Sequence, residues 1–289
     1  MIALVARTVG RNWAEFRSLE IHLQPRTDWL ALATLTVFFT YLWYIEAWRR
    51  LLAGWAQTIR FGPAARAWCL ANLGRYVPGK IWSVTGLVVL AQRAGVRASA
   101  AAASAVAFQA LVLGTGVAVV AGATPQATSA LRLAIGLLVA FGSLGVLVWG
   151  PTARWVGRVM NAEAPLAALP LSAVGASGAL MFLGWLTYGF AFWLFVRGLL
   201  PDTHVPIATA AGAFTLSYIL GTLALFAPGG IGVRELVLVS LLTPALGSGG
   251  ALAVSIGSRI LLTVTEAGAA LLSLALVRRS TAEGSPESP

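Results

Sequence analysis

The feature that most constrains this chain is a set of apolar runs of about 20 residues, two of which contain a Pro-Gly break. One break, FAPGGIGVRE, covers 226–235, and the other, RYVPGKI, covers 75–81. Proline removes a backbone donor, and glycine accepts angles that other residues avoid. In lipid, each freed backbone group costs several kcal/mol unless it is buried in protein or lines a polar cavity. Two such breaks in corresponding positions predict a transporter-like site.

Composition gives the fold class. Hydrophobic residues make up 58% of the 289 residues and charged residues only 10%, against roughly 25% charged in soluble domains. We therefore expect an all-α, polytopic integral membrane helical bundle. The single cysteine, Cys69, has no clustered His or Cys companions, so we predict no disulfide, no metal site and no cofactor.

The net charge of +10 has a simple explanation in a membrane protein. Arginine collects in cytoplasmic loops and is attracted to anionic headgroups. Nucleic-acid binding would need a basic patch on a soluble domain, and none is present.

Hydrophobic periodicity divides the chain into three parts. Residues 1–28 have helical spacing with arginines between, which predicts an amphipathic interfacial segment, although a partly ordered tail is the alternative. Residues 29–277 form one transmembrane domain, and residues 278–289 are predicted to be a disordered tail. The predicted helices of the domain are 29–48, 63–91 with its break, 99–120, 131–149, 173–196, 206–242 with its break, and 250–277.

Arginine in short loops sets the orientation. The turn 92–98, the loop 150–160 and the C-terminus are basic, whereas the turns 122–129 and 243–249 are uncharged. The positive-inside rule places the basic group in the cytoplasm, so 206–243 is a hairpin in a multi-pass protein of the cytoplasmic membrane. Residues 63–92 are either a re-entrant hairpin or one kinked crossing, because each half is about 22 Å or shorter. The hairpin puts the N-terminus outside; the kinked crossing puts it inside.

The two halves match element by element. Repeat 1 covers about 29–121, repeat 2 covers about 173–277, and the linking helix 131–149 supplies an inversion. Secondary transporters use this inverted-repeat plan, with sites where the broken helices meet. We therefore predict that the two hairpin tips lie together near the middle of the membrane.

Candidate site residues gather at the breaks and on the last helix. Ionisable side chains in apolar segments cost about 2.5–3.5 kcal/mol each, and they usually mark a pathway. Both breaks also start a new helix, where free backbone N–H groups attract anions. The predicted substrate-binding residues are Arg75, Pro78, Gly79, Lys80, Pro228, Gly229, Gly230, Gly232, Arg234, Glu235, Arg259 and Glu266.

The six ionisable residues of this set leave a surplus of two positive charges, which suits a phosphate-bearing headgroup. A purely structural alternative stays open. Arg259 and Glu266 are seven residues apart on one helix face, and Arg234 has an acidic neighbour, so these charges could simply neutralise each other.

The lead Asn72-Leu73-Gly74-Arg75 before Pro78-Gly79-Lys80, and the motif from Pro228 to Glu235, resemble the membrane region of bacterial lysyl-phosphatidylglycerol synthases. The same region occurs in stand-alone membrane proteins, and the likeness covers about 29–277. The resemblance implies a domain that moves aminoacylated phospholipid between leaflets. The aminoacyl-transferase domain of the synthases is not seen in this sequence, so synthesis of the lipid is not implied.

The sequence thus predicts a flippase for an anionic or phosphate-bearing lipid, with aminoacylated and polyprenyl-linked lipids as candidates. Arg75, Lys80, Arg234 and glycine N–H groups would bind the headgroup, and Glu235 would orient Arg234 or exchange a proton. The expected partners are membrane lipids with anionic headgroups, and a homo-oligomer or a partner enzyme stays open. The alternatives are an accessory membrane subunit and a lipid transferase, but no HExxH or Ser/His/Asp set supports an enzyme.

Overall fold

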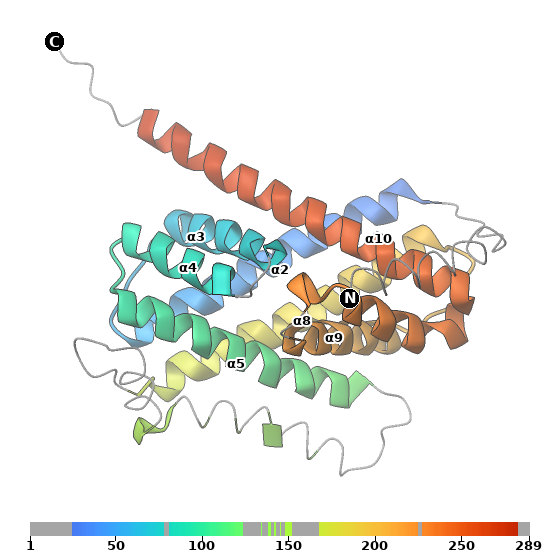
Figure 1. The fold of residues 1–289 in the computed structure, drawn as a ribbon, viewed down its shortest axis with the longest axis horizontal. Coiled ribbons are helices and arrows are strands. Elements are labelled where there is room, and N and C mark those ends of the chain that lie inside the picture. Colours follow the sequence, from blue (N-terminus) through green and yellow to red (C-terminus); the bar gives the residue numbers. More distant parts are fainter. Residues whose placement is uncertain are drawn as a thin grey trace.

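The computed structural model describes residues 25–77, 81–123, 168–224 and 227–282, with residues 134, 138, 139, 142, 145 and 148–151. All regular structure in these residues is helical (Figure 1). Four stretches are long and apolar enough to cross a membrane: α2 (Thr27–Gly54), α5 (Ala98–Ala123), α8 (Leu171–Leu199), and Pro228–Ala275, most of which belongs to α10 (Val233–Ala282). The prediction of an all-α polytopic membrane bundle is confirmed.

Helices α2 and α8 pack along each other and form the centre of the bundle. Ser177 Oγ donates a hydrogen bond to Ala47 O at 3.0 Å across this interface. A Cβ at Gly184 would lie 2.9 Å from the Tyr44 ring, so only glycine lets the ring pack there. Lipid tails are as apolar as the helices, so the hydrophobic effect does not drive membrane helices together. Close packing at small residues and hydrogen bonds of this kind hold them together instead.

Helix α5 closes one side of this pair with its small residues. Trp185 Nε1 of α8 donates to Val112 O at 2.9 Å, and Trp48 Nε1 of α2 donates to Ser104 Oγ at 2.8 Å. Because both indole donors are buried, each bond fixes the position of α5 against its neighbours.

The first broken segment is a helical hairpin. It consists of α3 (Phe61–Leu73), the 3₁₀ turn η1 (Gly74–Tyr76) and α4 (Ile81–Arg93), and α3 packs against α4. A Cβ at Gly74 would lie 2.8 Å from Ser83 N, and a Cβ at Gly86 would lie 3.6 Å from the Ala71 Cα. Because the end of α3 lies beside the start of α4, the two helices run antiparallel. The two helices have 13 residues each, about 20 Å. The structure therefore contains the hairpin and not the kinked crossing.

The second broken segment is also a hairpin. Helix α9 (Ile207–Leu223) leads into the 3₁₀ turn η2 (Pro228–Gly230), and α10 returns along α9. Helix α10 is broken at Gly247 (φ 69°, ψ 167°), so it is two helices, 233–246 and 248–282. The break lies in the uncharged turn predicted for 243–249.

The two hairpins approach each other tip to tip from opposite ends of the bundle (Figure 1). The turns η1 and η2 are in contact, and a Cβ at Gly229 would lie 3.6 Å from Arg75 O. The prediction that the tips lie together is confirmed. Their depth in the membrane and the inverted-repeat relation between the two halves stay predictions.

Three predicted segments are covered only in part. The interfacial segment 1–28 lies outside the described residues apart from its last four, and the linking helix 131–149 is described only at isolated positions. Helix α10 continues to Ala282, five residues beyond the predicted end at 277, and 283–289 lie outside the described part.

The close approach at Gly74 yields a first prediction. In Gly74→Ala the new methyl group would lie against the backbone of Trp82 and Ser83, both at 2.8 Å. Overpacking of this kind costs about 1–3 kcal/mol. We expect a lower midpoint in thermal unfolding of the purified protein in detergent. The control is Gly62→Ala in the same hairpin, where a Cβ meets nothing within 4 Å; equal midpoints for the two variants would contradict the packing described.

Candidate functional site

A cavity of about 290 Å³ lies where the two hairpin tips meet. The first hairpin and α5 form one wall, and α9, η2 and the start of α10 form the other. Its polar and charged side chains are Asn72, Arg75, Ser83, Gln109, Tyr218, Thr222 and Arg234. The cavity is therefore a polar chamber inside an apolar bundle, and both broken segments contribute to it.

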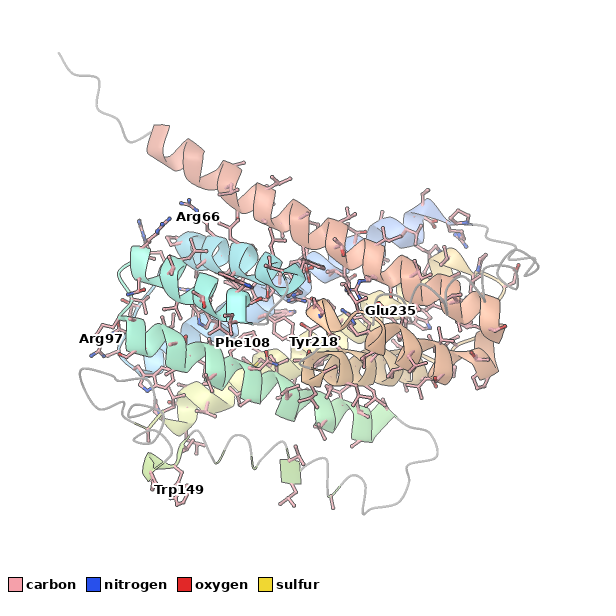
Figure 2. The ribbon with its side chains drawn as sticks, viewed as in Figure 1. Arg66, Arg97, Phe108, Trp149, Tyr218 and Glu235 are labelled. Carbon is pink, nitrogen blue, oxygen red and sulfur yellow. The ribbon has the colours of Figure 1, made fainter. Side chains whose placement is uncertain are left out.

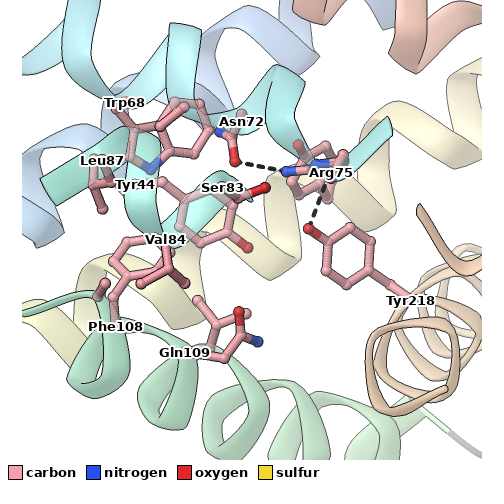
Figure 3. A pocket seen from close by; sticks show the side chains of 14 residues that line it. Tyr44, Trp68, Asn72, Arg75, Ser83, Val84, Leu87, Phe108, Gln109 and Tyr218 are labelled. Carbon is pink, nitrogen blue, oxygen red and sulfur yellow. Dashed lines mark hydrogen bonds between the residues drawn. The ribbon is translucent and has the colours of Figure 1, made fainter. Parts of the chain in front are cut away.

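Arg75 enters the cavity as half of an ion pair. Its Nη1 lies 3.0 Å from Glu266 Oε1, with 23% of the Arg75 side chain and 4% of the Glu266 side chain exposed. Arg75 also donates to Asn72 Oδ1 at 2.8 Å and to Tyr218 Oη at 3.3 Å (Figure 3). Tyr76 Oη donates to the other Glu266 oxygen at 2.8 Å. Glu266 thus neutralises the first tip and holds it against α10.

Arg259 and Glu235 form the second ion pair. Arg259 Nη1 donates to Glu235 Oε1 at 2.5 Å, and Arg259 Nη2 lies 3.4 Å from Gly229 O. The second oxygen of Glu235 accepts the Gly232 N–H at 2.6 Å. A glutamate that reaches back three residues to the first amide of its helix is half of a capping box. This pair therefore ties the second tip to the later part of α10.

These contacts correct the predicted backbone anion site at 230–232. Gly230 N donates to Ala227 O at 3.0 Å, and Ile231 N donates to Pro228 O at 3.1 Å. Gly232 N is bonded to Glu235. The 3₁₀ turn and the capping glutamate occupy the three amide donors, so none of them is left for a headgroup.

Arg234 differs from the other two arginines. Only 9% of the residue is exposed, and its guanidinium carbon lies 5.1 Å from the Tyr218 ring centre and 5.8 Å from that of Phe214. None of the described carboxylates forms an ion pair with Arg234. Aromatic faces attract a cation but do not neutralise it. Among the described residues, one positive charge without a carboxylate partner therefore lines the cavity.

The local pairings that the structural alternative offered do not form, and the expected role of Glu235 in orienting Arg234 is wrong. Arg259 pairs with Glu235 and not with Glu266, Glu266 pairs with Arg75, and Glu235 orients Arg259 and not Arg234. The charges pair between segments because the two tips, far apart in sequence, lie against the same helix.

A second cavity of about 110 Å³ adjoins the first, and Asn72, Arg75 and Tyr218 line both. Much of its wall is aromatic and comes from the rings of Tyr44, Trp68, Phe108 and Tyr188. Figure 3 labels the first three of these rings. Tyr44 Oη and Asn72 Nδ2 are buried there with no hydrogen-bond partner in the described structure. Buried polar atoms without partners are uncommon, and a ligand or water can satisfy them.

The structure brings most of the predicted site together. Arg75, Gly229, Gly230 and Arg234 line the cavity, and Glu235, Arg259 and Glu266 form the adjoining ion pairs. Pro228 begins η2, and Gly232 lies just after it. Pro78, Gly79 and Lys80 lie outside the described residues. Among the residues described, no three His, Cys, Asp or Glu side chains are grouped as metal ligands.

Sequence reasoning missed the side chains that complete the site: Tyr44, Asn72, Tyr76, Gln109 and Tyr218. Each is a polar or amphipathic residue inside an otherwise apolar helix or tip. That signal was available, because a polar group within a membrane segment costs free energy unless it has a partner.

The Arg75–Glu266 pair yields a second prediction. In Glu266→Gln the Arg75 guanidinium keeps its charge in the bundle and loses its counterion, which costs about 3 kcal/mol for a buried pair. We expect a clear drop in the thermal unfolding midpoint, partly restored when Arg75→Gln is added. The control is Glu46→Gln, which breaks the more exposed contacts with Arg49 and Arg50 at a cost of about 1 kcal/mol or less. A drop no larger than that of the control would show that the buried pair is not needed.

The comparisons with known proteins agree with this architecture. The chain matches the family model described as the lysylphosphatidylglycerol synthase TM region over residues 1–268. No curated protein and no solved structure matches it. The match includes both hairpin tips and all the ionisable residues discussed above. The chain therefore belongs to the family of lysylphosphatidylglycerol synthase transmembrane regions.

Proposed function

We propose that this protein is a flippase that moves a phosphate-bearing lipid between the leaflets of the cytoplasmic membrane. The observation that carries the proposal is Arg234, a buried guanidinium without a carboxylate partner among the described residues, in the cavity between the two tips. A cation in an apolar bundle is unfavourable unless something neutralises it. An anionic headgroup would supply the missing negative charge.

The chemistry of the cavity favours phosphate. The planar fork of a guanidinium matches the oxygen geometry of phosphate and is less strongly hydrated than an ammonium group. Arg75 lines the same cavity with a guanidinium whose charge Glu266 already balances. A bound phosphate would therefore contact the Arg234 guanidinium, which has no described counterion, and the N–H donors of the Arg75 guanidinium.

The adjoining aromatic cavity fits the rest of a headgroup. Its volume of about 110 Å³ adds to the 290 Å³ of the tip cavity, and pockets of about 300–1,000 Å³ hold small organic ligands. Tyr44 Oη and Asn72 Nδ2 have unmet hydrogen-bonding capacity there. A headgroup with hydroxyl or carbonyl groups beyond its phosphate would satisfy them.

The arrangement of the hairpins favours transport over catalysis. Sites of secondary transporters lie where opposed broken helices meet, and rocking of one half against the other exposes such a site to each side in turn. Glu235 and Glu266 are both held in ion pairs. Neither is a free general base, which a lipid transferase would need.

The test is leaflet-resolved transport in reconstituted vesicles. We expect Arg234→Gln to slow the movement of a fluorescent phosphatidylglycerol at least about tenfold, because a hydrogen bond to a charged group contributes about 1.5–3 kcal/mol. A diacylglycerol analogue, which lacks phosphate, should move equally in wild type and variant.

A matched control is Arg197→Gln. The Arg197 guanidinium also lies over two aromatic rings, 5.9 Å from each of Trp29 and Trp193, but it lines neither cavity. Equal phosphatidylglycerol rates for wild type and Arg234→Gln would rule out this site. A chemically altered lipid, detected by mass spectrometry, would indicate a transferase instead.

A further inference from the structure

A third cavity, of about 490 Å³, lies at the open end of the first hairpin. Its wall comes from the segment before α3, the first turns of α3 and the end of α4. It shares no lining residue with the two cavities at the tips. Arg66 precedes Arg75 by nine residues, and nine residues of helix span about 14 Å along the axis. The two sites therefore sit at opposite ends of one hairpin.

Three arginines line this cavity, and no acidic residue of the described part of the chain does. They are Arg60, Arg66 and Arg93 (Figure 2 labels Arg66). The two described carboxylates of the preceding helix are both engaged elsewhere: Asp28 pairs with Arg26 at 3.0 Å, and Glu46 binds Arg49 at 2.5 Å and Arg50 at 3.0 Å. None of the three cavity arginines forms an ion pair with a described residue. Three positive charges without a described counterion therefore line one cavity.

Arg66 gives the cavity a specific donor. Its Nε is buried and has no hydrogen-bond partner in the described structure. An arginine that merely lies at the level of the lipid headgroups would keep its N–H donors in contact with water. A buried N–H without an acceptor, beside two further guanidinium groups, is suited to an anion that brings its own oxygens.

The surroundings of the cavity favour a lipid over a soluble ion. Pro63, Leu90 and Ala94 give it an apolar side. Phe61, 40% exposed, stands next to Arg60 in the chain and lies under the Arg49 guanidinium at 5.8 Å. Aromatic rings beside arginines are typical of the membrane interface. The basic turn 92–98 lies at this same end, which the positive-inside rule places on the cytoplasmic side, where anionic lipids are abundant.

We infer that Arg60, Arg66 and Arg93 form a second anion site, which binds the phosphate of an anionic membrane lipid at the base of the α3–α4 hairpin. The guanidinium groups contact the phosphate oxygens, and Arg66 Nε donates to one of them. The apolar side contacts the glycerol and the first part of an acyl chain. This site does not depend on the transport proposal, because it uses none of the tip residues.

Native mass spectrometry of the full chain in detergent tests the inference. The probes are phosphatidylglycerol and phosphatidylcholine of the same chain length. We expect the wild type to retain one more phosphatidylglycerol than Arg66→Gln or Arg93→Gln, with at least tenfold weaker binding in the variants. Arg93 is exposed, so its variant remains informative if Arg66→Gln does not fold.

Two controls separate this site from general attraction and from the tip cavity. Arg97→Gln removes a charge at the same end, from an exposed side chain that does not line the cavity, and should leave phosphatidylglycerol binding unchanged. Arg234→Gln should keep the lipid at the hairpin base even where transport is lost.

Three outcomes would overturn the inference. The first is an equal loss of lipid in Arg97→Gln and Arg66→Gln, and the second is equal retention of phosphatidylcholine and phosphatidylglycerol. The third is displacement of the lipid by millimolar inorganic phosphate, which would assign the cavity to a free phosphate ion.

Discussion

The structure depends on one constraint: a charge inside an apolar bundle must find its counterion within the protein. Arg75 on the first tip and Glu235 on the second form no ion pair with a described neighbour in the chain. Both find it on the later part of α10, in Glu266 and Arg259. Because these two residues are two turns apart on one helix face, that face contacts both tips. The ion pairs therefore join two hairpins that are separated in the chain by residues 94–206.

The same constraint explains why Arg234 matters. Of the three described arginines at or against the tips, Arg75 and Arg259 each pair with one acid, and both described acids there are then engaged. Burying a third guanidinium against aromatic rings leaves a charge that the protein does not itself neutralise. A bundle that kept Arg234 only for stability would gain from replacing it with an apolar residue of similar size. Its presence is thus better explained by a ligand than by packing.

Much of the fold follows from the sequence, because periodicity and the Pro-Gly breaks are local signals. The spans at 29–48, 99–120 and 173–196 all lie inside observed helices, and the two breaks lie at hairpin tips. The pairing of charges is not local. Arg259 and Glu266 share a helix face as predicted, but which tip each contacts depends on how the hairpins dock. The capping role of Glu235 was readable from its place three residues after Gly232, and that pattern removes the Gly232 N–H from the expected amide site.

Two glycines of the second hairpin, Gly221 and Gly230, allow close packing around Arg234. Gly230 has φ +71°, and a Cβ there would lie 2.9 Å from the Gly221 Cα and 3.1 Å from the Arg234 Cγ. A Cβ at Gly221 would overlap the Arg234 side chain itself. The two glycines thus let α9 and η2 approach closely while the arginine stem passes beside them. The absence of their side chains leaves room for the guanidinium of Arg234, which is the group that we propose binds the anion.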